Sequence, residues 1–295
     1  MYLDDHLEKL RYFYEVARLG SMKKASEAVF ITQPSLTKSI KTLEEAVGSS
    51  LFIRMPRGVK LTREGEILFQ FCHGLFASIT NLEQKLSHPD DPMAGSLRVG
   101  TYDSIGIYFW PKFLKSFLPK FPQLELEMST GRSNDMQDKL ENGQVDLALI
   151  IEPRTSANII VETIQKDTFR LYATTSKKTV YESIQDAPLI LMESAIAGGQ
   201  SLNEVLASYG LDEHKLYKTS SLESVKELAL NGIGIGFLPQ MVAQGPVSKK
   251  KLKEISIGKI PSKGVGEHKI GLAYQKARKD SPLITTLIQE IKKSW

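Results

Sequence analysis

The chain has 295 residues, of which 24% are charged and 41% are hydrophobic, a composition that suits a globular protein of two domains. Its formal net charge of +4 is only mildly basic, so any affinity for nucleic acid must come from locally placed cations. No apolar run is long enough to span a membrane, and residues 1–10 lack the apolar core of a secretory signal. These features exclude a membrane partner and predict a cytoplasmic protein.

Residues 21–47 predict two helices joined by a tight turn. Ser21 can cap the first helix and Thr32 the second, in which Pro34 is tolerated because it lies in the first turn. Spacings of four, three and four residues place the apolar residues of the second helix on one face, and these are Leu36, Ile40, Leu43 and Val47. Polar and cationic side chains then project from its N-terminal half, as in a helix that enters the major groove of DNA. The alternative is an ordinary helical hairpin.

A basic hairpin follows, with strands predicted at 51–53 and 59–61 and a turn at 55–58 in which Pro56 and Gly58 favour type I. It carries the cations Arg54, Arg57 and Lys60, followed by Arg63, and no acid lies among them. Such a run is by itself more often a solvated loop, but behind a helix-turn-helix it predicts a wing that lies along phosphates. The residues expected to contact DNA are Ser21, Thr32, Gln33, Pro34, Ser35, Thr37, Lys38, Lys41, Arg54, Arg57 and Lys60.

Thr62 can cap a long helix that carries acids in its first turns. Its apolar seam alternates spacings of four and three, the pattern of a coiled coil, and comprises Leu68, Cys72, Leu75, Ile79, Leu82 and Leu86. The expected partner is the same helix of a second chain. The alternative is the apolar stripe of the chain's own first helix, at Leu10, Phe13, Tyr14 and Ala17. Cys72 is the only cysteine, so an intrachain disulfide is impossible, and on this seam it is expected to be a packed residue.

These residues resemble the LysR-type transcriptional regulators. The positions that carry the resemblance are Leu10, Phe13, Ala17, Gly20, Ser21, Ala25, Gln33, Pro34, Ser35, Leu36, Ile40, Leu43, Glu44, Gly48, Leu51, Phe52, Arg54, Leu61, Thr62, Gly65 and Glu66. The resemblance implies a winged helix-turn-helix DNA-binding domain at 1–62, a dimerising linker helix at 63–88, a hinge at 89–96 and an effector-binding domain at 97–295 that resembles periplasmic solute-binding proteins. It also implies dimers that assemble into tetramers.

Strands and helices alternate beyond the hinge, which predicts a largely parallel sheet and an α/β fold with two lobes. The expected strands are 97–101, 124–128, 145–151, 170–174 and 233–238, and the expected helices are 105–118, 134–141, 201–209, 222–230 and 282–292. Lobe I is assigned to about 97–167 and 275–295, and lobe II to about 168–274. The resemblance implies that strands near 168–173 and 269–274 connect the lobes.

Hydroxyl-rich loops follow several of these strands, where parallel sheets bind ligands near helix N-termini. The candidate effector-binding residues are Thr101, Tyr102, Asp103, Ser104, Thr130, Arg132, Ser133, Ser194, Gly199, Ser201, Ser220 and Ser221. The resemblance places Ser104 and Ser133 at positions that contact inducers in family members. The alternative is that each hydroxyl caps its own helix, which is the more common role of a single serine or threonine.

The sequence therefore predicts a sequence-specific regulator that binds promoter DNA and responds to a small molecule, with the transcription machinery as a further candidate partner. An architectural DNA-binding protein without an effector is the alternative.

The five histidines are scattered without ligand spacing, and the glycines at 232, 234 and 236 lack the context of a dinucleotide loop. We therefore expect no metal site, no cofactor and no enzymatic activity.

Overall fold

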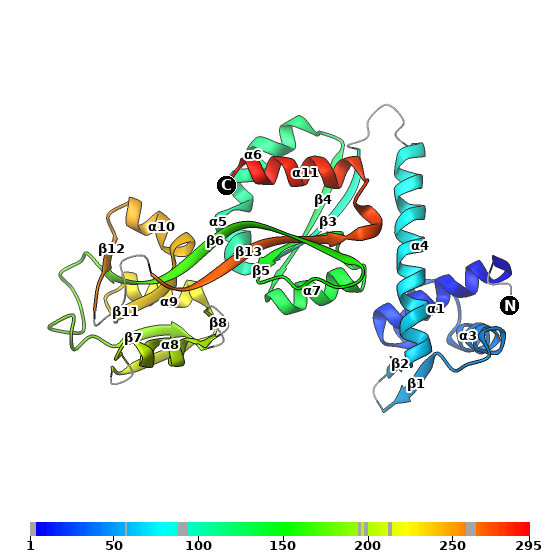
Figure 1. Ribbon diagram of the computed structural model, residues 1–295, viewed down its shortest axis with the longest axis horizontal. Helices are drawn as coiled ribbons and strands as arrows, with labels where there is room; N and C mark the ends of the chain where they lie inside the picture. Colours follow the sequence, from blue (N-terminus) through cyan, green and yellow to red (C-terminus); the bar gives the residue numbers. More distant parts are fainter. Residues whose placement is uncertain are drawn as a thin grey trace.

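The computed structural model describes residues 4–56, 58–87, 94–193, 196–197, 200–211, 214–257 and 264–295. Figure 1 shows three bodies in a row: an N-terminal domain (residues 4–87), a central lobe I and a distal lobe II. The predicted fold class is confirmed, because a helical domain with a hairpin and a long helix precedes a two-lobed α/β domain. None of the described helices is both long and apolar enough to cross a bilayer.

The N-terminal domain begins with η1 (Asp4–His6), α1 (Leu7–Leu19), α2 (Met22–Ala28) and α3 (Gln33–Val47). Both predicted caps are present, since Ser21 Oγ accepts a hydrogen bond from the backbone N–H of Lys24 and Thr32 Oγ1 accepts one from that of Ser35. The predicted apolar face of α3 is buried in the domain core at Leu36, Ile40 and Leu43. Local capping and apolar spacing therefore explain both helices.

The predicted hairpin is formed by β1 (Phe52–Met55) and β2 (Gly58–Leu61), which pair antiparallel. Met55 lies opposite Gly58, so the strands join at the predicted turn of residues 55–58. Leu51, expected in the first strand, instead lies just before it and is fully buried. Arg57 lies outside the described residues.

The long helix is α4 (Arg63–Ser87), and Thr62 Oγ1 accepts a hydrogen bond from the backbone N–H of Gly65 at its start. The predicted seam divides into two parts. Leu68 and Cys72 pack in the chain's own core beside α1, and burial raises the pKa of the Cys72 thiol to about 12. Leu82 and Leu86 are 56% and 72% exposed. The chain's own first helix therefore covers the first part of the seam, while the far end stays exposed in this chain, and its packing on a second chain stays a prediction.

Lobe I contains the parallel strands β3 (Gly95–Tyr102), β4 (Leu124–Gly131) and β5 (Leu147–Ile151), with the helices α5 (Asp103–Tyr108), α6 (Trp110–Phe117), α7 (Ser133–Glu141) and α11 (Pro282–Lys293) and the turn η2 (Leu118–Lys120). The expected single helix at 105–118 is wrong. It breaks at Phe109, because Pro111 has no N–H to donate and lies in the first turn of a new helix. Of the expected hinge, residues 89–93 lie outside the described residues, and β3 begins at Gly95.

Lobe II contains the strands β7 (Leu189–Met192), β10 (Leu216–Thr219), β11 (Ile235–Pro239) and β12 (Leu252–Ile255), the short pair β8 (Ile196–Ala197) and β9 (Gln200–Ser201), and the helices α8 (Leu202–Ser208), α9 (Leu222–Leu230) and α10 (Gln240–Ser248). β7 pairs parallel with β10 and β11. No range was predicted for β7, β10 or β12: β7 is a short apolar run without alternation, and β10 and β12 are four-residue strands that include charged residues.

Two long antiparallel strands, β6 (Ile159–Thr174) and β13 (Val265–Gln275), run through both lobes (Figure 1). The expected connections near 168–173 and 269–274 are confirmed. The expectation of a largely parallel sheet holds within each lobe and is wrong at these strands, because the chain crosses between the lobes once in each direction. The resulting strand order is β10-β7-β11-β6-β13-β5-β3-β4, with β12 paired to β6.

Helices cover both faces of the lobe I sheet. Leu147 and Leu149 of β5 pack in the core that contains α6 and α11, while Ala148 and Ile150 pack in the core that contains α7. Successive residues of a strand point to opposite faces, so a run of apolar residues fits a strand buried on both sides. The loops that leave β3, β4 and β5 are thereby held at one edge of lobe I.

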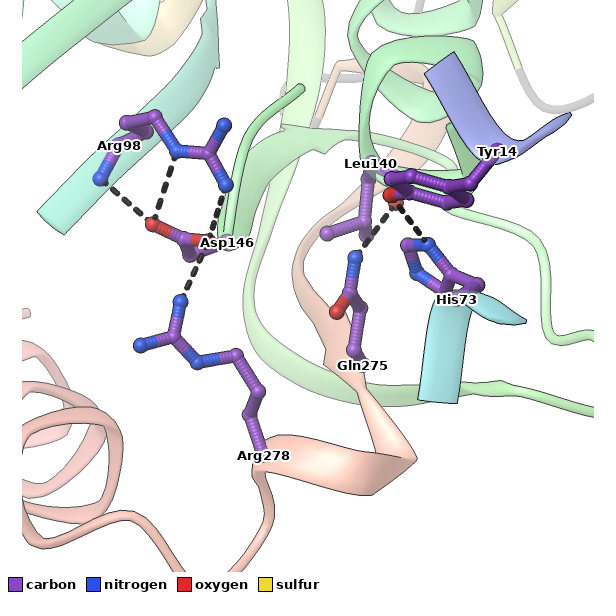
Figure 2. A network of polar contacts seen from close by, with 7 residues as sticks. All are labelled: Tyr14, His73, Arg98, Leu140, Asp146, Gln275 and Arg278. Atoms are coloured by element: carbon purple, nitrogen blue, oxygen red, sulfur yellow. Dashed lines mark hydrogen bonds and ion pairs between the residues drawn. The ribbon is translucent and has the colours of Figure 1, made fainter. Parts of the chain in front are cut away.

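Lobe I contacts the N-terminal domain through a junction with a polar interior (Figure 2). Tyr14 of α1 and His73 of α4 share a hydrogen bond of 3.0 Å between the phenol oxygen and Nδ1. From lobe I, Gly143 lies against both of these side chains, and Gln144 Nε2 donates to the backbone carbonyl of Arg18 at 3.4 Å. A cavity of about 570 Å³ lies beside these contacts and is lined by both bodies.

Asp146 supports the lobe I side of this junction (Figure 2). Its buried carboxylate forms ion pairs with Arg98 of β3, at 2.8 Å, and with Arg278 of η3 (Lys276–Arg278). Burial alone would raise the pKa of Asp146, but the two guanidinium groups outweigh burial and hold the pKa below its usual value. Burial, followed by the charge of Arg98, lowers the pKa of His73. The junction therefore combines a charged aspartate with a neutral histidine.

Replacing Gly143 with alanine should loosen this junction. Gly143 has φ +67°, and a Cβ there would lie 2.4 Å from the Tyr14 hydroxyl and 2.7 Å from His73 Cε1. Gly48→Ala is the matched control, because Gly48 has φ +77° and no described atom within 4 Å of its Cβ position. Both variants carry a backbone penalty of about 1–2 kcal/mol. We expect only Gly143→Ala to increase the radius of gyration in small-angle X-ray scattering, and equal radii for the two variants would contradict this account.

Candidate functional site

The N-terminal half of α3 presents the polar surface expected of a DNA-reading helix. Gln33, Ser35 and Lys38 are exposed, and none of them has a hydrogen bond or ion pair through its side chain among the described residues. Pro34 and Lys41 are exposed as well, and Lys41 lies 3.8 Å from Glu45. The exposed, unengaged side chains are therefore an amide, a hydroxyl and an ammonium, which are the groups that contact base edges and phosphates.

Three predicted DNA-contacting hydroxyls already have backbone partners. Ser21 and Thr32 cap their helices, and Thr37 Oγ1 donates to the backbone carbonyl of Gln33 at 2.9 Å. Each retains an oxygen that can accept a further hydrogen bond. Their first role is nevertheless to hold the α3 N-terminus in place, so we rank them below Gln33, Ser35 and Lys38 as readers of sequence.

The wing does not gather its cations on one face. Arg54 lies opposite Val59 and Lys60 lies opposite Ile53, so the two exposed cations point to opposite faces of the hairpin. The sequence shows these charges but not which face of the hairpin each side chain occupies. A phosphate backbone that contacts both must therefore approach the edge or the tip of the wing.

The second candidate site is a cavity of about 380 Å³ between the lobes. The predicted residues that line it are Tyr102, Asp103, Ser104, Arg132, Ser133, Ser220 and Ser221. They follow β3, β4 and β10, and the cavity also contacts the crossing strands at Asp167, Phe169, His268 and Ile270. Sequence reasoning missed this second group, because those residues lie inside long strands rather than after strand ends. Polar loops and apolar strand residues together make a typical ligand cavity.

Thr101 and Thr130 do not line the cavity, contrary to expectation. Thr101 is fully buried, where its hydroxyl donates to the backbone carbonyl of Leu149 and accepts from Trp110 Nε1, both at 3.0 Å. Thr130 is exposed near the end of β4 and lies outside the cavity lining. Ser194 and Gly199 lie outside the described residues. Ser201 belongs to β9, and its side chain is not among the described parts.

Helix capping does not account for the cavity serines. Ser221 makes no side-chain cap for α9, and Ser133 Oγ accepts instead from the backbone N–H of Ile151 at 3.0 Å. Ser104 is only 7% exposed, and its hydroxyl has no hydrogen-bond partner in the described part of the chain. Since Ser104 lines the cavity, its hydroxyl can donate to and accept from a ligand there.

Asp167 caps the helix α10 from a distant part of the chain. Its carboxylate accepts hydrogen bonds from the backbone N–H groups of Thr168, Gln240 and Met241 at 2.7, 3.1 and 3.0 Å. No side-chain cation lies within 4.0 Å of it among the described residues. The free N–H groups that an anionic ligand would use at this helix are therefore already occupied.

A polar contact joins the lobes beside the cavity. Tyr108 of lobe I donates to Glu223 of lobe II at 2.5 Å and accepts from Lys226 at 2.8 Å, and Lys226 forms an ion pair with Glu223 at 2.5 Å. Burial raises the pKa of Tyr108 to about 12. Burial alone would lower the pKa of Lys226, but its bonds to Glu223 and Tyr108 raise it above the usual value. Tyr108 therefore keeps its proton and Lys226 keeps its positive charge at neutral pH.

The described residues include no group of three histidine, cysteine, aspartate or glutamate side chains suited to hold a metal ion. The groups that line the cavity are hydroxyls, carboxylates and a guanidinium beside an apolar wall.

Removal of the hydroxyl should lower the stability of the protein at Thr101 but not at Ser104. Thr101→Val leaves the buried Trp110 N–H without an acceptor and should lower the free energy of unfolding by about 1–3 kcal/mol. Ser104→Ala breaks no described hydrogen bond and should leave stability nearly unchanged. Urea denaturation followed by tryptophan fluorescence measures both. A larger loss in Ser104→Ala than in Thr101→Val would show that Ser104 is structural.

Comparison with known proteins identifies two family domains in the chain. Residues 90–295 match the LysR substrate binding domain, and residues 7–66 match the bacterial regulatory helix-turn-helix proteins of the lysR family. The uncharacterized HTH-type transcriptional regulator YwbI of Bacillus subtilis (strain 168) is 29% identical over 258 residues, which is 85% of each chain.

Two solved structures show the same fold over nearly the whole chain. A full-length OxyR variant from Pseudomonas aeruginosa has a TM-score of 0.68 and 21% identity and covers 98% of this chain and 93% of its own. Full-length LysG from Corynebacterium glutamicum, solved with its effector arginine, has a TM-score of 0.68 and 17% identity and covers 98% and 97%. Because the family match extends over most of the chain and includes both domains, the protein belongs to the LysR-type family of transcriptional regulators.

Proposed function

We propose that this regulator binds promoter DNA sequence-specifically through pairs of winged domains and responds to a small molecule in the cavity between its lobes. The observation that carries the proposal is the exposed, unengaged trio Gln33, Ser35 and Lys38 at the start of α3. An amide can pair with a base edge in two places, and an ammonium can contact phosphate or guanine. Ser21, Thr32, Thr37, Arg54 and Lys60 contribute mainly to docking in this proposal.

The ligand acts by stabilising one arrangement of the lobes. Residues from both lobes line the cavity, and Tyr108 and Glu223 already bridge the lobes beside it. A ligand shifts such an equilibrium only if it binds one arrangement more tightly than the other. Lobe I also contacts α1 and α4 at Gly143 and Gln144, so a change in lobe I has a direct route to the winged domain.

The proposal places the protein in the cytoplasm as a dimer or tetramer, with the transcription machinery as a further partner. It assigns no catalytic activity and no cofactor. Two winged domains held by one oligomer convert a change in their spacing into a change in the bend of bound DNA.

Selection of bound duplexes from a random DNA pool tests this function. The purified full-length protein is used at near-physiological salt, because low salt inflates non-specific phosphate binding. Enrichment of an inverted repeat is the expected result and supplies the probe for a metabolite screen. A soluble protein that enriches no sequence, with or without metabolites, would instead support an architectural DNA-binding protein.

Substitutions on α3 should separate base reading from phosphate contact. Gln33→Ala should cost about 1–3 kcal/mol in discrimination at one base pair, while Lys38→Ala should weaken binding to all sequences and reduce the salt slope by about one if Lys38 contacts phosphate. Lys115→Ala, an exposed lysine of α6 in lobe I, is the control. Fluorescence anisotropy on the selected site and on single mismatches measures these effects. Unchanged base preference in Gln33→Ala would remove that residue from the reading surface.

The exposed end of the α4 seam should hold the dimer together. Leu82→Glu combined with Leu86→Glu places two charges where a second chain would bury leucines, and we expect monomers in analytical ultracentrifugation. Val180→Glu is the matched control, because Val180 is 68% exposed in lobe II. If the double variant has the same mass as the control, the dimer interface lies elsewhere.

A further inference from the structure

The cavity between the lobes contains more negative than positive charge. Its lining includes four carboxylates, Asp103, Glu152, Asp167 and Glu223, and one guanidinium, that of Arg132. The net charge that a ligand meets in the cavity depends on which of these groups already have partners within the protein.

Glu223 is neutralised within the protein. One of its oxygens accepts from Tyr108, and the other pairs with Lys226 at 2.5 Å. The other three carboxylates have no ion pair within 4.0 Å among the described residues. Glu152 accepts only the backbone N–H of Lys269, and Asp167 accepts only backbone N–H groups. The cavity lining therefore contains three carboxylates without an ion pair and one guanidinium.

Asp167 is the charge that most restricts the ligand. It is 8% exposed and fixed by three backbone donors, which are neutral groups and leave its negative charge uncompensated by any cation. A buried charge interacts strongly with others, because water screens it poorly. Asp167 also occupies the N-terminus of α10, so this helix end attracts no second anion.

The cavity also offers a ligand contacts that do not depend on charge. Ser104 lines it and is more than nine-tenths buried as a residue, and its hydroxyl has no hydrogen-bond partner among the described residues. Phe169, Met192 and Ile270 supply an apolar wall. With about 380 Å³, the cavity suits a small molecule that combines a charged group with a short apolar part.

We propose that the effector is a small organic cation that carries a protonated amine or a guanidinium, an inference that rests on the proposed function of this cavity. Asp103 and Glu152 belong to lobe I, whereas Asp167 is bound to the first residues of α10 in lobe II. A cation between them is attracted by both lobes and so favours the arrangement in which the lobes are close. Ser104 bonds to the ligand, and the apolar wall contacts its carbon chain.

Four probes with the same butyl chain test the sign of the preferred charge: butylammonium, butylguanidinium, butan-1-ol and butyrate. Each is titrated into the full-length protein at pH 7 and followed by protein-observed NMR and calorimetry. We expect at least one cation to bind about tenfold more tightly than butan-1-ol and butyrate to bind most weakly, since a nearby charge of opposite sign readily supplies a factor of ten.

Neutral variants locate the effect. Asp103→Asn and Asp167→Asn should each reduce the preference for the cation over the alcohol severalfold. Asp135→Asn should leave it unchanged, because Asp135 is an exposed acid in the first turn of α7 that does not line the cavity. Asp103 is exposed and makes no described structural contact, so its variant gives an answer even if Asp167→Asn unfolds the start of α10.

The outcomes distinguish this inference from the proposed function. Preference for butyrate, equal binding of all four probes, no binding, or a cation preference that survives both cavity variants overturns the cationic effector. None of these results changes the DNA selection, which tests the regulator separately. Conversely, a chain that binds cations here but selects no DNA sequence would overturn the proposed function and leave the charge preference of the cavity standing.

Discussion

The antiparallel pair of β6 and β13 is the interaction on which the rest of the C-terminal domain depends. These strands run through both lobes: β13 pairs with β5 of lobe I, and β6 pairs with β11 and β12 of lobe II, which joins the two lobes. The cavity lies along them, since Asp167, Phe169, His268 and Ile270 all line it. Because only two strands cross, the lobes can close over a ligand while each keeps its own core.

Buried charges give the two ends of lobe I different properties. Toward the N-terminal domain, Asp146 is paired with Arg98 and Arg278, so that end is internally neutralised and firmly held. At the boundary with lobe II, Asp167 accepts only from backbone N–H groups, two of them at the start of α10 in that lobe, and its carboxylate lines the cavity without an ion pair among the described residues. Removing a partner from a buried ion pair is costly, whereas an unpaired charge beside a cavity is available for a ligand. The proposed route from the cavity to the winged domain therefore passes a lobe I junction supported by paired charges.

Sequence patterns predicted the N-terminal domain well and the cavity only in part. The caps at Ser21, Thr32 and Thr62 and the apolar face of α3 depend on residues three or four positions apart, and all were predicted. The expected helix at 105–118 was wrong, because Pro111 was not recognised as the start of a new helix. Thr101 was assigned to the cavity, because a position after a strand does not reveal whether the side chain faces the core. The faces of Arg54 and Lys60 required the register of the hairpin.

The sequence by itself determined the family, the winged helix-turn-helix, the alternation of strands and helices and seven of the residues that line the cavity. These features depend on local periodicity, capping and ordered motifs, which involve residues close together in the sequence. Only the tertiary structure decided that Asp167 caps α10 across 73 residues, that Tyr108 meets Glu223 across 115, and that Tyr14 and His73 lie against Gly143. The physical reason is that the charge balance of a cavity depends on which groups folding brings together and pairs, and no local pattern records those partners.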